Sequence, residues 1–252
     1  MYKNSRRILI IFIFTLLINA CSWNRDMSRK EVSYRESILT KAKNYGGLIT
    51  LYRNKLKIKE DDTFRLKLAN AYYLAGDTES SLYFLEPIAH KKNESIYLLQ
   101  AKNLINKNDD ATASIVINKL ITMSPKNAEA HNMKGIILAS NGKINEAKKS
   151  INQSRNLFIS DEIAMNNLAV VAMLDKRYTE AVRILLPDYL AGKRGSFMLH
   201  NLVFSLIKID DDKYAKKIIL AEKMAKDPDE LILALSQINT LDKDNVISVS
   251  EK

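Results

Sequence analysis

The sequence reads EAKKSI at residues 146–151 and EAVRIL at residues 180–185, which is 34 residues later. Alanine keeps this step over four positions, and a large aliphatic residue follows each alanine by four residues. Small residues recur upstream with the same period. Several positions in phase indicate a repeated structural unit. The three sets are Ala113, Ala147, Ala181 and Ala215; Ile117, Ile151, Leu185 and Ile219; and Ala101, Gly135, Ala169 and Val203.

This period and its columns of small residues resemble the tetratricopeptide repeat (TPR). The resemblance implies that each unit is a hairpin of two helices, in which small side chains allow a close approach. We therefore expect an all-α superhelical solenoid of about five hairpins. The units are predicted at residues 62–93, 94–127, 128–161, 162–195 and 196–229.

Two weaker segments flank these units. Residues 34–57 have helical periodicity with Gly46-Gly47 at the close-packing position, so they predict a degenerate first repeat. Residues 229–241 carry Leu231, Leu235 and Ile238 on one face and predict a C-terminal capping helix, which places the whole solenoid at 34–241. Pro87 and Pro187 fall late in the second helices of their units, where proline is expected to end or kink the helix.

The N-terminus has the layout of a secretory signal, with Lys3, Arg6 and Arg7 before an uncharged apolar stretch at residues 8–18. Its end resembles a bacterial lipobox, which implies a signal peptide at 1–20 and a lipid on Cys21, although Asn19 departs from the usual pattern. An ordinary signal peptide and an uncleaved anchor are the alternatives. By the same resemblance, Ser22 favours the outer membrane, with the chain on its periplasmic face. Residues 21–33 then form a lipidated tether, and 242–252 a flexible tail.

Composition excludes several classes of protein. The chain has 252 residues with a single cysteine, which excludes an intramolecular disulfide framework and any multi-cysteine metal site. The formal net charge is +10, from 39 basic and 29 acidic residues, and removal of residues 1–20 would lower it to +7. Because the bases spread over nearly all predicted helices without an aromatic-interleaved strip, we expect no nucleic-acid partner. A diffuse, weak attraction to acidic lipid or protein surfaces is the favoured interpretation.

Motifs for catalysis are missing from the sequence. It contains no nucleophile elbow, phosphate-binding glycine loop or histidine-rich metal spacing. Acidic clusters at 60–62, 109–110 and 210–212 fall at predicted turns, where carboxylates cap helix N-termini. His131 is expected to pack rather than to bind a ligand. We therefore predict that the protein is not an enzyme, needs no metal and carries no cofactor besides the lipid on Cys21.

The TPR resemblance also implies a groove along the first helices of the hairpins, where a partner peptide or helix binds. Asn132, Asn166 and His200 share one column, in which amides could hydrogen-bond an extended peptide; a column that simply faces water is the alternative. Met173, Phe204 and Tyr73 would add adaptable apolar contacts. The groove residues carried over are Leu66, Asn70, Tyr73, Leu98, Lys102, Asn132, Ile136, Asn166, Val170, Met173, His200, Phe204 and Lys208.

Within the TPR proteins, residues 166–169 (NNLA), 178–181 (YTEA) and 185–187 (LLP), followed by 200–202 (HNL) and Ala215, resemble the TadD family of tight-adherence (Tad/Flp) pilus assembly lipoproteins. The resemblance covers mainly residues 62–228. It implies a non-catalytic assembly factor that binds a secretin or another pilus component at the outer membrane. The alternatives are a type IV pilotin, a TPR adaptor lipoprotein for cell-wall enzymes, and, from another class, a periplasmic enzyme.

Overall fold

The computed structural model describes residues 27–238, and within them the chain is all-helical, with thirteen α-helices, one short 3₁₀ helix and no strand. The predicted signal peptide, Cys21 and the predicted tail lie outside the described residues. The chain divides into two compact units, one ending at Phe84 and the other beginning at Leu85. The all-α fold class predicted from the 34-residue period is therefore confirmed.

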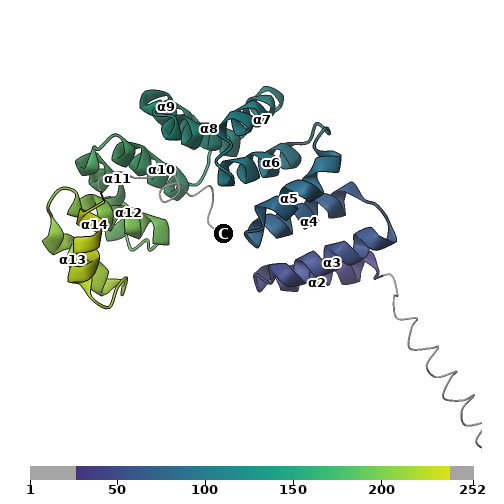
Figure 1. Cartoon of the computed structure of the whole chain (residues 1–252), viewed down its shortest axis with the longest axis horizontal. Helices are drawn as coiled ribbons and strands as arrows, with labels where there is room; N and C mark the ends of the chain where they lie inside the picture. Colours follow the sequence, from purple (N-terminus) through teal and green to yellow (C-terminus); the bar gives the residue numbers. More distant parts are fainter. Residues whose placement is uncertain (1–26, 239–252) are drawn as a thin grey trace, which may run out of the picture. The chain divides into compact units, whose positions relative to one another are not determined.

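The first unit contains α2 (Arg29–Lys41), α3 (Tyr45–Ile58), α4 (Asp62–Leu74) and most of α5 (Thr78–Leu85) (Figure 1). Its core is formed by Val32, Leu48, Leu51, Tyr52, Leu68 and Ala71. A Cβ at Gly47 would lie 2.6 Å from Leu39 Cδ2, so the predicted close approach between the first two helices occurs at this glycine.

The second unit begins with η1 (Glu86–Ile88) and continues as antiparallel hairpins. Its helices are α6 (Glu94–Asn106), α7 (Asp110–Met123), α8 (Ala128–Ser140), α9 (Ile144–Asn156), α10 (Asp161–Leu174), α11 (Tyr178–Leu190), α12 (Ser196–Ile207), α13 (Asp212–Ala221) and α14 (Pro228–Ser236). Within this unit, α6, α8, α10 and α12 follow one another along the inner side of the curved row, and we call them the inner helices (Figure 1).

The repeated columns form the core of these hairpins. Ala113, Ala147, Ala181 and Ala215 are fully buried, and so are the aliphatic residues four positions later. At Gly135 a Cβ would lie 2.5 Å from Ile151 Cγ1 and 3.2 Å from the Ala147 carbonyl oxygen, so any side chain would push α8 away from α9. The spacing of small residues in the sequence thus indicates where two helices are in contact.

The acidic clusters cap helices, as predicted. Asp61 accepts hydrogen bonds from the backbone N–H groups of Thr63 and Phe64, at 2.8 and 3.1 Å. Asp109 and Asp211 do the same for the helices that follow them. These bonds satisfy N–H groups that have no partner inside the helix, and they lower the pKa of Asp61 and Asp109.

The ends of the solenoid differ from the prediction. Helix α2 begins at Arg29 inside the predicted tether, because Ser28 caps it by accepting from the Glu31 N–H and Val32 is buried. At the other end α14 stops at Ser236, so the predicted contact face is wrong at Ile238, which lies beyond the helix and is exposed. Ile232 is the buried residue of this helix.

The two prolines also behave differently from each other. Pro87 follows the end of α5 and lies in the short 3₁₀ helix η1, as a helix-ending proline should. Pro187 lies inside α11, which continues to Leu190, so of the two expected effects the helix end does not occur. Beyond it the helical pattern is kept, since the Ala191 N–H bonds the Pro187 carbonyl.

Candidate partner-binding face

The inner helices of the second unit form one continuous layer. Helix α6 contacts α8, α8 contacts α10, and α10 contacts α12, so each hairpin joins the next through its first helix. A face built this way presents equivalent positions at a regular step along the row. The residues at the joints between neighbouring inner helices therefore set the spacing of this face.

Each of these joints is bridged by one polar side-chain contact. Lys102 on α6 pairs with Glu129 on α8 at 2.6 Å. The Asn167 amide nitrogen on α10 donates to Asn132 Oδ1 on α8 at 2.8 Å, and the Asn201 amide nitrogen on α12 donates to Asn166 Oδ1 on α10 at 2.9 Å. We call the two amide contacts the asparagine bridges.

The asparagine bridges give the polar column a role that neither interpretation of it anticipated. Asn132 exposes 1% of its surface and Asn166 7%, so both lie inside the joints and neither faces open water. Each uses its oxygen to hold the next inner helix. His200 is exposed and its Nδ1 lies 2.6 Å from the Ser196 carbonyl oxygen, so the column is not uniform.

The apolar residues expected in the groove lie beneath its surface. Ile136, Val170, Met173 and Phe204 are all buried. The Phe204 ring contacts the Tyr178 ring edge-to-face, with centroids 6.0 Å apart. These side chains therefore support the inner helices from below, which corrects the expectation that Met173 and Phe204 offer adaptable contacts at the surface.

The remaining predicted residues are placed as follows. Lys208 lies 5.4 Å from the Phe204 ring centroid and donates to the Ser236 carbonyl, so it joins α12 to α14. Leu98 is half-buried on α6. Leu66, Asn70 and Tyr73 belong to the first unit, where Leu66 is half-buried, Asn70 is exposed and Tyr73 is buried.

Comparisons with known proteins agree with this geometry. The family model for the tetratricopeptide repeat matches residues 116–149. A TPR protein of Thermus thermophilus superposes with a TM-score of 0.61 at 18% identity, covering 71% of this chain and 100% of that one. A TPR protein of Parabacteroides merdae gives 0.59 at 13% identity, covering 82% and 97%. The fold is that of the TPR proteins. The sequence matches no curated protein at a significant level.

Sequence reasoning missed Asn167 and Asn201 as partners in this TPR row. It compared residues 34 positions apart, which lie at equivalent places on different helices. The asparagine bridges join residues 35 apart, because a contact across a joint pairs two neighbouring columns. The signal available in the sequence was a second polar column one position later, with Asn167 and Asn201.

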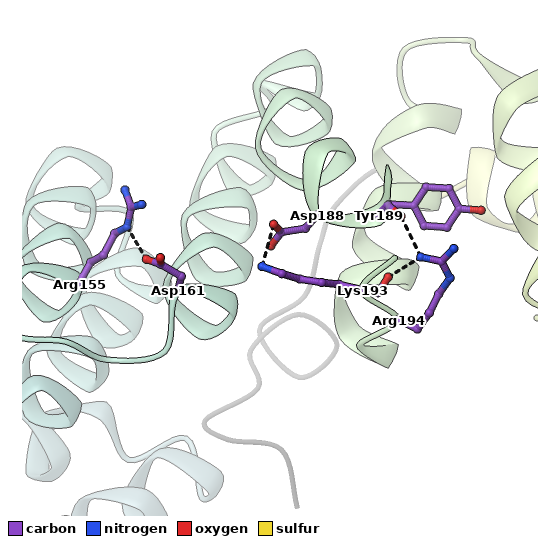
Figure 2. Close-up of polar contacts among 6 residues, drawn as sticks. All are labelled: Arg155, Asp161, Asp188, Tyr189, Lys193 and Arg194. Carbon is purple, nitrogen blue, oxygen red and sulfur yellow. Dashed lines mark hydrogen bonds and ion pairs between the residues drawn. The ribbon is translucent and has the colours of Figure 1, made fainter. Parts of the chain in front are cut away.

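Ion pairs fix the loops at the ends of the second helices (Figure 2). Arg155 binds Asp161 at 2.6 Å across the loop from α9 to α10, and it lowers the pKa of that carboxyl through this bond. After α11, Lys193 binds Asp188 at 2.9 Å, which raises the pKa of Lys193. Arg194 donates to the Tyr189 carbonyl at 2.8 Å. These exposed contacts order the loops and carry no chemistry of their own.

Residues 27–238 hold no group of three or more histidine, cysteine or acidic side chains close enough to share a metal ion. None of the helices in the same range combines the length and apolarity needed to cross a bilayer.

Proposed function

We propose that this protein is a non-catalytic TPR adaptor that binds a secretin-type component of a pilus or secretion machine through its inner helices. In this proposal a lipid on Cys21 anchors the chain to the outer membrane on the periplasmic side. The TadD resemblance at residues 166–169, 178–181 and 200–202 supports the choice of a tight-adherence pilus.

The asparagine bridges are the observation that carries the binding proposal. The two bridges hold α8 to α10 and α10 to α12, so exposed positions on these helices, such as His200, have a fixed spacing before a partner arrives. Asn132 and Asn166 are themselves buried and set this spacing from inside the joints. A surface that is ordered before binding loses less conformational entropy when a peptide arrives.

The test measures capture of a purified secretin by the chain and by two variants. Replacing Asn132 and Asn167 together by Leu removes a whole bridge without leaving one buried amide unpaired. Adding His200→Ala removes the exposed member of the column. We expect the triple variant to bind the secretin at least about tenfold more weakly, which corresponds to about 1.4 kcal/mol.

The matched control changes two exposed amides on the outer helix α9, Asn145→Leu and Asn152→Leu. It should capture the secretin as well as the parent chain does. Full-strength capture by the triple variant would disprove binding through the inner helices. Equal loss in both variants would show that the effect is not specific to this face.

The lipid anchor is tested separately. Palmitate labelling of the chain in a bacterial host should disappear on Cys21→Ala, and the variant should leave the membrane fraction. Labelling that persists in the variant would contradict the lipidation proposal without bearing on partner binding.

A further inference from the structure

Almost all of the net positive charge of the described residues lies in one hairpin. Residues 29–59, which comprise α2, α3, the loop between them and the residue after α3, hold nine basic and two acidic residues. The other described residues from 60 to 238 hold 24 basic and 23 acidic residues, which nearly cancel. The expectation of a diffuse surplus is therefore wrong. The bases of this basic hairpin are Arg29, Lys30, Arg35, Lys41, Lys43, Arg53, Lys55, Lys57 and Lys59.

The two acidic residues do little to neutralise this charge. Glu36 is bound by Lys67, which reaches it from α4 at 2.7 Å. Glu31 pairs with Arg35 at 3.3 Å, and both side chains are about half exposed. A further five bases are exposed and make no ion pair within residues 27–238: Arg29, Lys30, Lys41, Arg53 and Lys57.

One side of α2 combines these bases with exposed apolar side chains. Lys30, Tyr34, Ile38 and Lys41 follow one another by four, four and three residues, so they share one face of the helix. The opposite face carries Val32, which is buried in the first unit. Tyr34 is 69% exposed and Ile38 48%, although large apolar side chains are normally the first to be buried.

We propose that this face of α2 lies against the surface of a bilayer that contains anionic phospholipid. Lysine and arginine are attracted to acidic headgroups, and a tyrosine with a neighbouring aliphatic side chain suits the boundary between headgroups and acyl chains. An acidic protein surface would use the charges but would not need Tyr34 and Ile38 exposed between them. The bilayer therefore explains both halves of the pattern.

This inference goes beyond the proposed adaptor function and uses different residues. Helix α2 begins eight residues after Cys21, so a lipid at Cys21 would bring the basic hairpin close to the membrane. The attraction itself does not require the lipid. It would press the N-terminal unit onto the bilayer, a task for which the nearly neutral repeats are not suited.

The experiment measures co-sedimentation of the full chain with vesicles of phosphatidylcholine alone and of phosphatidylcholine with an equal part of phosphatidylglycerol. Every chain carries Cys21→Ala, so that no covalent lipid contributes and residues 1–26 are otherwise the same in all arms. The quantity compared is the affinity for the vesicles with phosphatidylglycerol divided by the affinity for those of phosphatidylcholine alone. Replacing Lys30 and Lys41 on this face, and the adjoining Arg29, by Gln should lower this ratio about 100-fold.

A matched control replaces three exposed bases of the second unit, Lys126, Lys149 and Lys213, by Gln and should leave the ratio within about threefold of the parent. Circular dichroism confirms that both triple variants fold. A parent chain without preference for anionic vesicles, or equal losses in both triple variants, would overturn the proposal.

The apolar part has its own variant. Tyr34→Ala with Ile38→Ala should weaken binding to the anionic vesicles by roughly tenfold while leaving all charges in place. If this variant binds as the parent does while the charge variant loses its preference, the face recognises negative charge in general and the bilayer assignment is wrong.

Discussion

The basic hairpin at the start of the chain and the repeats from α6 to α13 are built by the same packing rule but carry different surfaces. Both place a glycine where two helices meet, Gly47 against Leu39 in the hairpin and Gly135 against Ile151 in the repeats. Yet the hairpin concentrates the positive charge, and the rest of the described chain is nearly neutral. Packing therefore constrains the interior columns of a TPR array and leaves each hairpin free to present its own exterior.

The largest effect is expected where the glycines are replaced. Gly135→Val should lower the free energy of unfolding by about 3 kcal/mol, because its Cβ meets Ile151 Cγ1 and the backbone oxygen of Ala147, neither of which can move away easily. Gly47→Val should cost about 1 kcal/mol, since the atoms in its way belong to the side chains of Leu39 and Asn44 and not to the backbone. Urea unfolding followed by circular dichroism measures both. Equal losses would mean that the two glycines are equivalent.

The next largest loss of stability is expected when an asparagine bridge is removed. Both bridges lie in the repeats and neither lies in the basic hairpin. Asn167→Ala leaves the oxygen of Asn132 buried without its donor and should cost about 2 kcal/mol. Asn152→Ala, an exposed amide on α9, should change stability by less than about 0.5 kcal/mol. Thermal unfolding of the two variants provides the measurement. An effect at Asn167 as small as that at Asn152 would show that the bridge does not stabilise the fold.

Alkaline pH should destabilise the basic hairpin through Tyr52. Burial, and then the nearby Glu36 carboxylate, raise the pKa of Tyr52 above its ordinary value of 10.0. Because the pKa of Tyr52 is higher in the folded than in the unfolded chain, its contribution to stability is fully present below pH 10.0. That contribution is lost as the pH rises from 10.0 toward the pKa of the folded state, by at most about 1.4 kcal/mol per pH unit. Tyr52→Phe should remove this part of the alkaline loss. A pH profile that is the same for Tyr52→Phe and the parent would contradict it.

The repeats should lose stability in acid, so this part of the stability rises with pH, whereas the Tyr52 contribution falls. The hydrogen bond from Lys148, at 2.9 Å, lowers the pKa of Glu180 below its ordinary value of 4.5 and joins α9 to α11. A lowered pKa contributes stability above the ordinary value, and that contribution disappears as pH falls through the pKa of the folded state. Glu180→Gln should cost about 0.5 kcal/mol at neutral pH and nothing in strong acid. Unfolding at both pH values checks the difference.

The sequence was sufficient for the fold because the repeat lies in buried positions. Alanine at 113, 147, 181 and 215 can be recognised without a structure, since each is fully buried and the four recur at one period. The acidic caps were equally readable, because a carboxylate just before a helix has one local role.

The candidate site was less predictable, since it depends on contacts between helices. A period of 34 identifies equivalent residues but not those that touch, so the partners of Asn132 and Asn166 were missed. The start of α2 was missed because Arg29 and Lys30 look like a polar tether until Val32 is seen to be buried. The net charge of the whole chain does not show where the surplus of basic residues lies, so its concentration in residues 29–59 was missed.

The asparagine bridges also bear on how such a chain changes length during evolution. Deletion of residues 162–195, one period of 34, would remove Asn166 and Asn167 together. Asn201 would then stand 35 residues after Asn132, the same separation that Asn167 has now. The shortened array would re-form a bridge at the new joint, so whole repeats can be lost or duplicated without leaving a buried amide unpaired.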